Sequence, residues 1–152
     1  YNMGHIGADN SNSIYERQIA AKYIESLKNY PLKLNIGLPI FTWGIHIRNN
    51  KPIELINKMD IKAFDLDTNF IKTDKIRLKA KRNYIKFGYY FKQNDEVKIE
   101  QINLVDLIEM AGDLSKNLKQ KPLEIIFYDF DSININKYNN EIQNFKKIID
   151  NF

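Results

Sequence analysis

The sequence lacks cysteine altogether and contains no long apolar run. Without cysteine, a disulfide-stapled scaffold and a thiolate metal site are both excluded. No stretch approaches the roughly 18 consecutive apolar residues that a transmembrane helix needs. The chain begins at Tyr1 without a basic-then-apolar leader, so we expect no signal peptide within it. With 43% apolar and 28% charged residues in 152 positions, the composition is that of a folded domain with a sizeable core.

Positive charge is in small excess, with 23 Lys and Arg against 19 Asp and Glu, which gives a net charge of +4. The cations are mostly Lys, and the sequence is also rich in Ile and Asn, a bias typical of an AT-rich genome. Nucleic-acid binding usually calls for a clustered patch that includes Arg. The net charge by itself therefore indicates little about a partner.

The two ends of the chain combine helical periodicity with short apolar runs. Helices are predicted near residues 16–29, 103–119 and 136–150. Strands are predicted over residues 32–41 and 123–130, because both runs are apolar and of strand length. Since helices and strands alternate, these segments predict a parallel α/β layer.

The middle of the chain, residues 44–100, follows a different pattern. Asn49 and Asn50 lie between two short apolar segments and predict a hairpin whose turn tolerates positive φ. Residues 74–80 alternate cations with apolar side chains, as a half-buried strand does. Further short strands follow, so this region is predicted to be an antiparallel α+β insertion.

The order of these pieces resembles the last third to half of a chitinase-like, family-18-like glycoside hydrolase (β/α)8 barrel of bacterial type. Tyr1-Asn2 looks like the end of the Met-x-Tyr-Asp/Asn motif that closes the sixth strand of that family. Residues 37–41 (Gly-Leu-Pro-Ile-Phe) are similar to its seventh strand, after which the family carries a small α+β insertion. Residues 126–128 (Ile-Phe-Tyr) resemble the eighth strand, which ends in Trp in the family and in Tyr128 here.

This resemblance implies an α/β fold, namely the C-terminal portion of a TIM (β/α)8 barrel with a small α+β insertion. Residues 1–43 and 101–152 would be barrel βα units, about strands 6 to 8, and residues 44–100 the insertion. The acid motif of the family would lie upstream of Tyr1, so no catalytic residue is expected in this fragment. The missing N-terminal part of the same barrel would then be its partner, and a secreted or cell-envelope location is favoured.

The resemblance also implies a function, the binding or hydrolysis of a carbohydrate, with N-acetylated glycans as the substrate class. Tyr1 and Asn2 would hydrogen-bond the acetamido group, while Trp43 and Tyr128 would offer flat aromatic faces to a sugar ring. Tyr1 and Asn2 also have a purely structural explanation as an ordinary strand terminus, and Trp43 has one as a core or insertion-packing side chain. Asp131, close to Tyr128, is better explained as a helix or loop cap. A catalytically inactive sugar-binding barrel is an open alternative.

A rival hypothesis is a nucleic-acid-binding module that uses the cationic and aromatic stretch 72–92. Alternation explains that stretch more simply, with cations on the solvent face and aromatic rings in a small core, so nucleic acid is disfavoured as a partner. His5 and Asp9 have the i, i+4 spacing of metal ligands, but they lie in a loop without further ligands. No metal, no cofactor and no membrane partner is therefore predicted.

Overall fold

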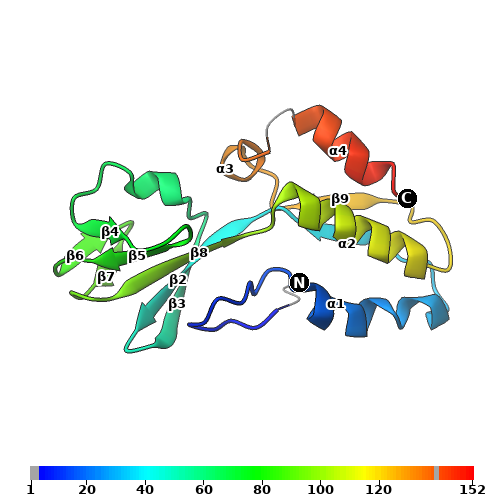
Figure 1. The fold of residues 1–152 in the computed structure, drawn as a ribbon. Helices are drawn as coiled ribbons and strands as arrows, with labels where there is room; N and C mark the ends of the chain where they lie inside the picture. The colour runs from blue at the N-terminus through cyan, green and yellow to red at the C-terminus, as the bar shows by residue number, and fades with distance from the viewer. Residues whose placement is uncertain (1–3, 139–140) are drawn as a thin grey trace. The chain divides into compact units, whose positions relative to one another are not determined.

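The computed structural model describes residues 4–138 and 141–152, and Figure 1 shows its elements in chain order. The chain divides into two compact units. Unit 1 comprises residues 1–5, 12–41 and 101–152, and unit 2 comprises residues 6–11 and 42–100. Each unit has its own sheet and its own buried side chains.

Unit 1 is built on a short parallel pair of strands, β1 (Ile36–Pro39) and β9 (Ile125–Tyr128). Its helices are α1 (Arg17–Ile24), the 3-10 turn η1 (Leu27–Asn29), α2 (Leu104–Asn117), α3 (Ser132–Ile135) and α4 (Glu141–Ile149). Helix α2 contacts β1, α1 and α4. The expected parallel pairing of these two apolar runs is confirmed.

The two faces of the β1–β9 pair differ in burial, because successive side chains of a strand point to opposite faces. Ile36 and Leu38 are buried on one face, where α2 contributes the buried side chains of Leu107, Met110, Ala111 and Leu114 at helical spacing. On the other face Ile126 and Tyr128 of β9 are exposed. The pair therefore has one covered face and one open face.

Local capping sets the starts of two helices in unit 1. Asn103 precedes α2, and its side-chain oxygen accepts a hydrogen bond from the Asp106 N–H at 2.9 Å. Asp131 caps α3 in the same way, accepting from the Asn134 N–H at 2.9 Å. The predicted helix over 103–119 is confirmed, whereas the helix predicted over 136–150 is observed only from 141 to 149.

Unit 2 contains a five-stranded sheet with the order β3-β2-β8-β5-β4 and a separate hairpin, β6–β7. The strands are β2 (Thr42–Arg48), β3 (Lys51–Asn57), β4 (Phe70–Lys72), β5 (Arg77–Ala80), β6 (Tyr84–Lys86), β7 (Tyr89–Phe91) and β8 (Glu96–Gln101), with a 3-10 turn η2 at Ile61–Phe64. Asn49 and Asn50 join β2 to β3 with φ values of 52° and 59°. The predicted hairpin is therefore confirmed, since its tight turn places both central residues at positive φ.

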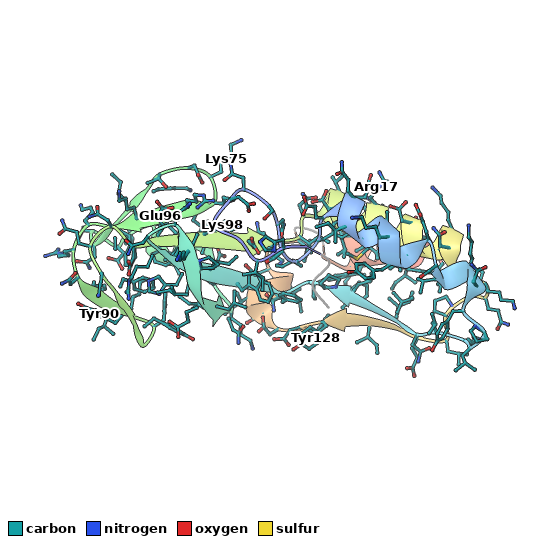
Figure 2. All side chains as sticks on the ribbon, turned by 90° about the horizontal axis from the view of Figure 1, so that it is seen from below. Arg17, Lys75, Tyr90, Glu96, Lys98 and Tyr128 are labelled. Atoms are coloured by element: carbon teal, nitrogen blue, oxygen red, sulfur yellow. The ribbon has the colours of Figure 1, made fainter. Side chains whose placement is uncertain are left out.

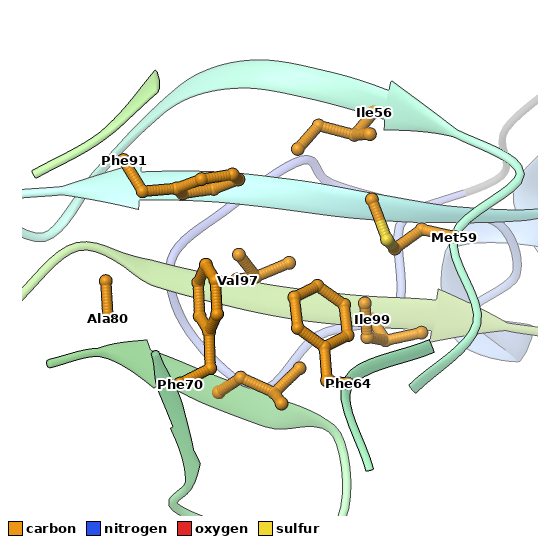
Figure 3. Close-up of a cluster of buried hydrophobic side chains, with 9 residues drawn as sticks. Ile56, Met59, Phe64, Phe70, Ala80, Phe91, Val97 and Ile99 are labelled. Carbon is orange, nitrogen blue, oxygen red and sulfur yellow. The ribbon is translucent and has the colours of Figure 1, made fainter. Parts of the chain in front are cut away.

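A cluster of buried apolar side chains forms the core of unit 2 (Figure 3). The Phe70 ring lies at its centre, with its centroid 5.0 Å from that of Phe64 and 5.2 Å from that of Phe91, both edge-on. Such edge-to-face contacts add to the stabilisation that burial itself supplies. The cluster consists of Ile56, Met59, Phe64, Phe70, Leu78, Ala80, Phe91, Val97 and Ile99.

The predicted C-terminal portion of a TIM (β/α)8 barrel is wrong. The described strands are mostly antiparallel and form no closed barrel, whereas β1 pairs with β9 in parallel. The alternation of helices and strands at the two ends of the chain suggested a parallel layer. Most of the sheet instead comes from residues 42–100, where β2 pairs with β3, β4 with β5, and β5 with β8, all antiparallel.

Candidate functional site

The candidate site lies at the carboxyl-terminal ends of β1 and β9, which meet at one edge because the strands are parallel. In open α/β sheets, ligands bind in the crevice outside the carboxyl ends of the strands. Here the chain places Phe41 just after β1, and Tyr128 followed by Asp129 and Phe130 at the end of β9. We call these four residues and Lys137 the β1–β9 edge.

Tyr128 is a highly exposed aromatic side chain of the β1–β9 edge and is labelled in Figure 2. It is 65% exposed, although its ring is large and mostly apolar. The Phe41 ring meets it edge-on, with centroids 6.0 Å apart and an interplanar angle of 77°. A T-shaped contact covers at most one face of the Tyr128 ring, so at least one face is clear of Phe41 and can stack on a flat ligand.

Lys137 connects the ends of the two strands to the segment that follows α3. Its ammonium group donates a hydrogen bond to the Phe41 carbonyl oxygen at 3.1 Å and lies 5.2 Å from the centroid of the Tyr138 ring. Lys137, Tyr138 and Asn144 line a pocket of about 280 Å³ together with residues 101–104, which lead into α2. This volume is close to the lower end of the range typical of small-molecule sites, about 300 Å³.

Internal hydrogen bonds hold the segment after β9 in place. The buried Asn134 side chain donates to the Asp129 carbonyl oxygen at 2.9 Å. The Tyr138 hydroxyl donates to the Ile102 carbonyl oxygen at 3.0 Å, and burial raises the pKa of this phenol above its usual value. Tyr138 therefore stays neutral and keeps its donor over the physiological pH range, which fixes one wall of the pocket.

The structure describes two of the four residues predicted to bind substrate, Tyr128 in unit 1 and Trp43 in unit 2. Tyr128 lies at the β1–β9 edge, whereas Tyr1 and Asn2 lie outside the described residues. Trp43 lies in β2 of unit 2, where its indole N–H donates to Glu100 Oε2 at 2.9 Å. The alternative explanation of Asp131 as a helix cap is confirmed, because it caps α3.

Sequence reasoning missed Lys137, Tyr138 and Asn144 as contributors to the site. All three follow the final strand and the short helix α3, and none belongs to a motif with a recognisable spacing. Their position after the second of two apolar strands could have indicated them, because segments that follow parallel strands line the same edge of a sheet.

A second group of functional side chains, buried in unit 2, combines a histidine with a carboxylate. His46 Nε2 lies 2.8 Å from Asp95 Oδ2, and Arg48 donates to the same carboxylate from Nη2 at 2.7 Å. Burial raises the pKa of Asp95, but the hydrogen bonds from Arg48, His46 and the Lys92 N–H outweigh it, so that this pKa lies below its usual value. His46 is only 1% exposed, which keeps a substrate from reaching its ring. The pair therefore stabilises the sheet and does not form an active site.

A buried ion pair in unit 2 joins Lys98 to Glu100, with 2.7 Å between Nζ and Oε1. Lys98 also donates to the carbonyl oxygens of Asp9 and Ser11, each at 3.0 Å. Arg77 donates to the carbonyl oxygens of Ala8 and Asp9 at 2.7 Å and 2.6 Å. These cations fasten residues 6–11 to the sheet of unit 2, so their role is structural.

Two classes of site find no support in the described part of the chain. Among residues 4–138 and 141–152, no group of three or more His, Asp or Glu is placed to hold a metal ion. None of the described helices is both long enough and apolar enough to span a bilayer.

Comparison with known proteins returned no relatives. No protein-family model matches the sequence, and neither a curated protein nor a solved structure matches the chain. The function is therefore inferred from the chemistry of the β1–β9 edge.

Proposed function

We propose that this protein binds a carbohydrate at the β1–β9 edge, with N-acetylated glycans as the ligand class. The observation that carries the proposal is the Tyr128 ring, which is 65% exposed at the carboxyl end of a parallel pair of strands. No hydrolytic step is assigned to the described residues, because Asp131 is committed to capping α3.

The chemistry of a sugar ring suits this edge. A pyranose presents an apolar C–H face that packs on an aromatic ring, and a rim of hydroxyl groups that needs hydrogen-bond partners. Tyr128 supplies the ring, and Phe130, also 65% exposed, extends the apolar surface along the chain.

The pocket beside Lys137 suits an acetamido substituent. That group carries an apolar methyl, a carbonyl acceptor and an N–H donor. The pocket offers apolar surface from Leu104, and the Lys137 ammonium as a donor. Phe41 lies in edge contact with Tyr128 and accepts the hydrogen bond from Lys137, so stacking surface and pocket share one supporting residue.

Calorimetric titration of the protein with the trimer of N-acetylglucosamine tests this proposal. We expect binding, and Tyr128→Ala should weaken it about 3- to 10-fold, the effect of losing one aromatic contact. The matched control is Tyr23→Ala, which removes a 64% exposed tyrosine from α1 and should leave affinity unchanged. Tyr128→Phe, which keeps the ring, should bind like the parent protein.

Two results would contradict the proposal. One is the absence of measurable binding of the trimer by the parent protein. The other is equal binding by the Tyr128→Ala and Tyr23→Ala variants, which would show that Tyr128 takes no part.

A further inference from the structure

The net positive charge of the chain belongs to unit 2. The sequence of unit 2 contains thirteen Lys and Arg against nine Asp and Glu, whereas that of unit 1 contains ten of each. Within unit 2 the excess is concentrated in residues 72–92, where eight residues are Lys or Arg and Asp74 alone is acidic. A cation-rich segment of this kind attracts a polyanion.

The β6–β7 hairpin lies inside that segment and exposes apolar and aromatic side chains. Its register pairs Ile85 with Tyr90, and these two are 65% and 49% exposed. Phe87, in the turn at a φ of 53°, is 53% exposed. Figure 2 labels Tyr90 on this hairpin. The expectation that the aromatic residues here fill a small core is therefore wrong for Phe87 and Tyr90, because only one face of the hairpin packs inward.

The inner face anchors the hairpin to the core of unit 2. Phe91 is fully buried, and its ring packs edge-on against Phe70. Lys86 pairs with Asp67 at 2.7 Å and lies 4.7 Å from the centroid of the Phe87 ring. Because these contacts fix the inner face, the outer side chains are presented on a rigid support.

Three cations that form no ion pair with a described carboxylate lie at the base of the β6–β7 hairpin. Lys81 and Arg82 precede β6, Lys92 follows β7, and all three are exposed. The two ends of the hairpin lie together, because the Gln93 N–H donates to the Asn83 side chain at 2.9 Å. None of the three cations forms an ion pair with any acidic residue that the structure describes. Their charge is therefore available to a ligand.

We propose that the outer hairpin surface, formed by Tyr90, Phe87, Lys81, Arg82 and Lys92, binds single-stranded nucleic acid. Proteins that bind single strands combine cations that follow the phosphates with aromatic rings on which bases stack. The hairpin supplies both groups within one short segment. A duplex keeps its bases stacked internally, so an unpaired strand makes fuller use of Tyr90 and Phe87. This inference is independent of the carbohydrate site in unit 1.

Fluorescence anisotropy with a labelled oligothymidylate of about 20 nucleotides tests the inference at two or more salt concentrations. The parent protein should bind it more tightly than a duplex of equal phosphate count. Tyr90→Leu, which keeps bulk but removes the ring, should weaken binding about 5- to 100-fold, the effect of losing one stacked base. Tyr90→Phe should bind like the parent protein, and unchanged Trp43 emission shows that each variant is folded.

Charge is tested by the triple variant K81Q/R82Q/K92Q, which should lower the slope of log affinity against log salt by about 2. Its control, K33Q/K119Q/K121Q, removes three exposed lysines from unit 1 and should leave the slope unchanged. Equal slopes for the two triple variants would overturn the inference, because non-specific net charge would then explain binding.

Dextran sulfate, which carries charge but no bases, separates nucleic acid from other polyanions. We expect Tyr90→Leu to weaken binding to oligothymidylate and not to dextran sulfate. Equal losses on both polymers, no loss on either, or no binding of oligothymidylate by the folded parent protein would overturn the inference.

Discussion

Unit 1 and unit 2 differ in what they bury. The buried polar side chains of unit 1 are neutral, namely Ser13, Asn134 and Asn144, among the residues that the structure describes. Unit 2 buries charged and titratable groups, with Asp95, Lys98, Glu100 and His46 each no more than 3% exposed. A buried charge is costly unless it is paired, so removal of one partner is more harmful than loss of a surface ion pair. Unit 2 should therefore be the more sensitive to charge-changing substitutions and to acid.

The chain offers a separate spectroscopic probe of each unit. Trp43, the sole tryptophan of the sequence, lies in unit 2, so its emission reports the unfolding of that unit. The helices α1 to α4 all lie in unit 1, so ellipticity at the helical wavelength reports mainly unit 1. The contrast in buried charge can be tested by following both signals in the same urea titration.

The largest effect is expected for Lys98→Met. The substitution leaves Glu100 buried without its cation and removes the hydrogen bonds to the carbonyl oxygens of Asp9 and Ser11. We expect the free energy of unfolding reported by Trp43 to fall by about 3–5 kcal/mol. The control Lys51→Met, at an exposed position of β3, should change it by less than about 0.5 kcal/mol.

The double variant K98M/E100Q sharpens this prediction. Glutamine removes the uncompensated charge and keeps an acceptor for the Trp43 indole N–H, so part of the lost stability should return. If Lys98→Met and Lys51→Met prove equally mild, the buried ion pair does not stabilise unit 2.

A smaller effect is expected from acid through Asp95. Its pKa is held below the usual value of about 3.9, so its contribution is fully present above that pH. Stability is then lost as the pH falls through the lowered pKa, because protonation weakens the hydrogen bonds from Arg48 and His46. We expect a loss of about 1–3 kcal/mol in the Trp43 transition. Asp95→Asn should remove this contribution and leave that of Asp67, whose pKa is also lowered by its hydrogen bonds with Lys86 and Asn69, whereas Asp65→Asn, at an exposed position, should preserve both.

The smallest effect should fall on unit 1. Asn103→Ala removes the side-chain cap of α2 and should lower the stability reported by the helical signal by about 1 kcal/mol. Asn103→Ser, which can accept the same hydrogen bond, should restore most of it. A loss confined to the Trp43 signal would contradict the assignment of α2 to unit 1.

The elements that could be predicted from sequence are those set by a few neighbouring residues. Asn103 caps a helix through a residue three positions later, and Asn49-Asn50 reverses the chain by adopting positive φ. The apolar runs around Leu38 and Phe127 were also predicted to be strands, and the two strands pair in parallel. Each of these features is decided within a short window of sequence, which explains why reasoning from the sequence located them.

The predictions that were wrong concern features that depend on contacts between distant residues. Trp43 was expected at the end of the strand that precedes it, but the chain starts a new strand at Thr42. The Thr42 hydroxyl shares its one proton between the carbonyl oxygens of Met59 and Glu100, 17 and 58 positions away. No local pattern announces such contacts, and the barrel expectation failed for the same reason. Within the candidate site, the end of a strand identified Tyr128, whereas Lys137 is placed by the carbonyl of Phe41, 96 positions earlier.

The attachment of residues 6–11 to unit 2 bears on how this chain can be cut and recombined. That segment is bound by Lys98 and Arg77, while the residues on either side of it belong to unit 1, so the chain crosses between the units after residues 5, 11, 41 and 100. A fragment of residues 42–100 would lack residues 6–11. Lys98 and Arg77 would then lose the backbone carbonyl oxygens that accept their hydrogen bonds. Unit 2 therefore cannot be moved to another protein as the single segment 42–100. Transfer of unit 2 to another protein requires both segments, 6–11 and 42–100, and deletion of 42–100 leaves residues 6–11 without the cations that bind them.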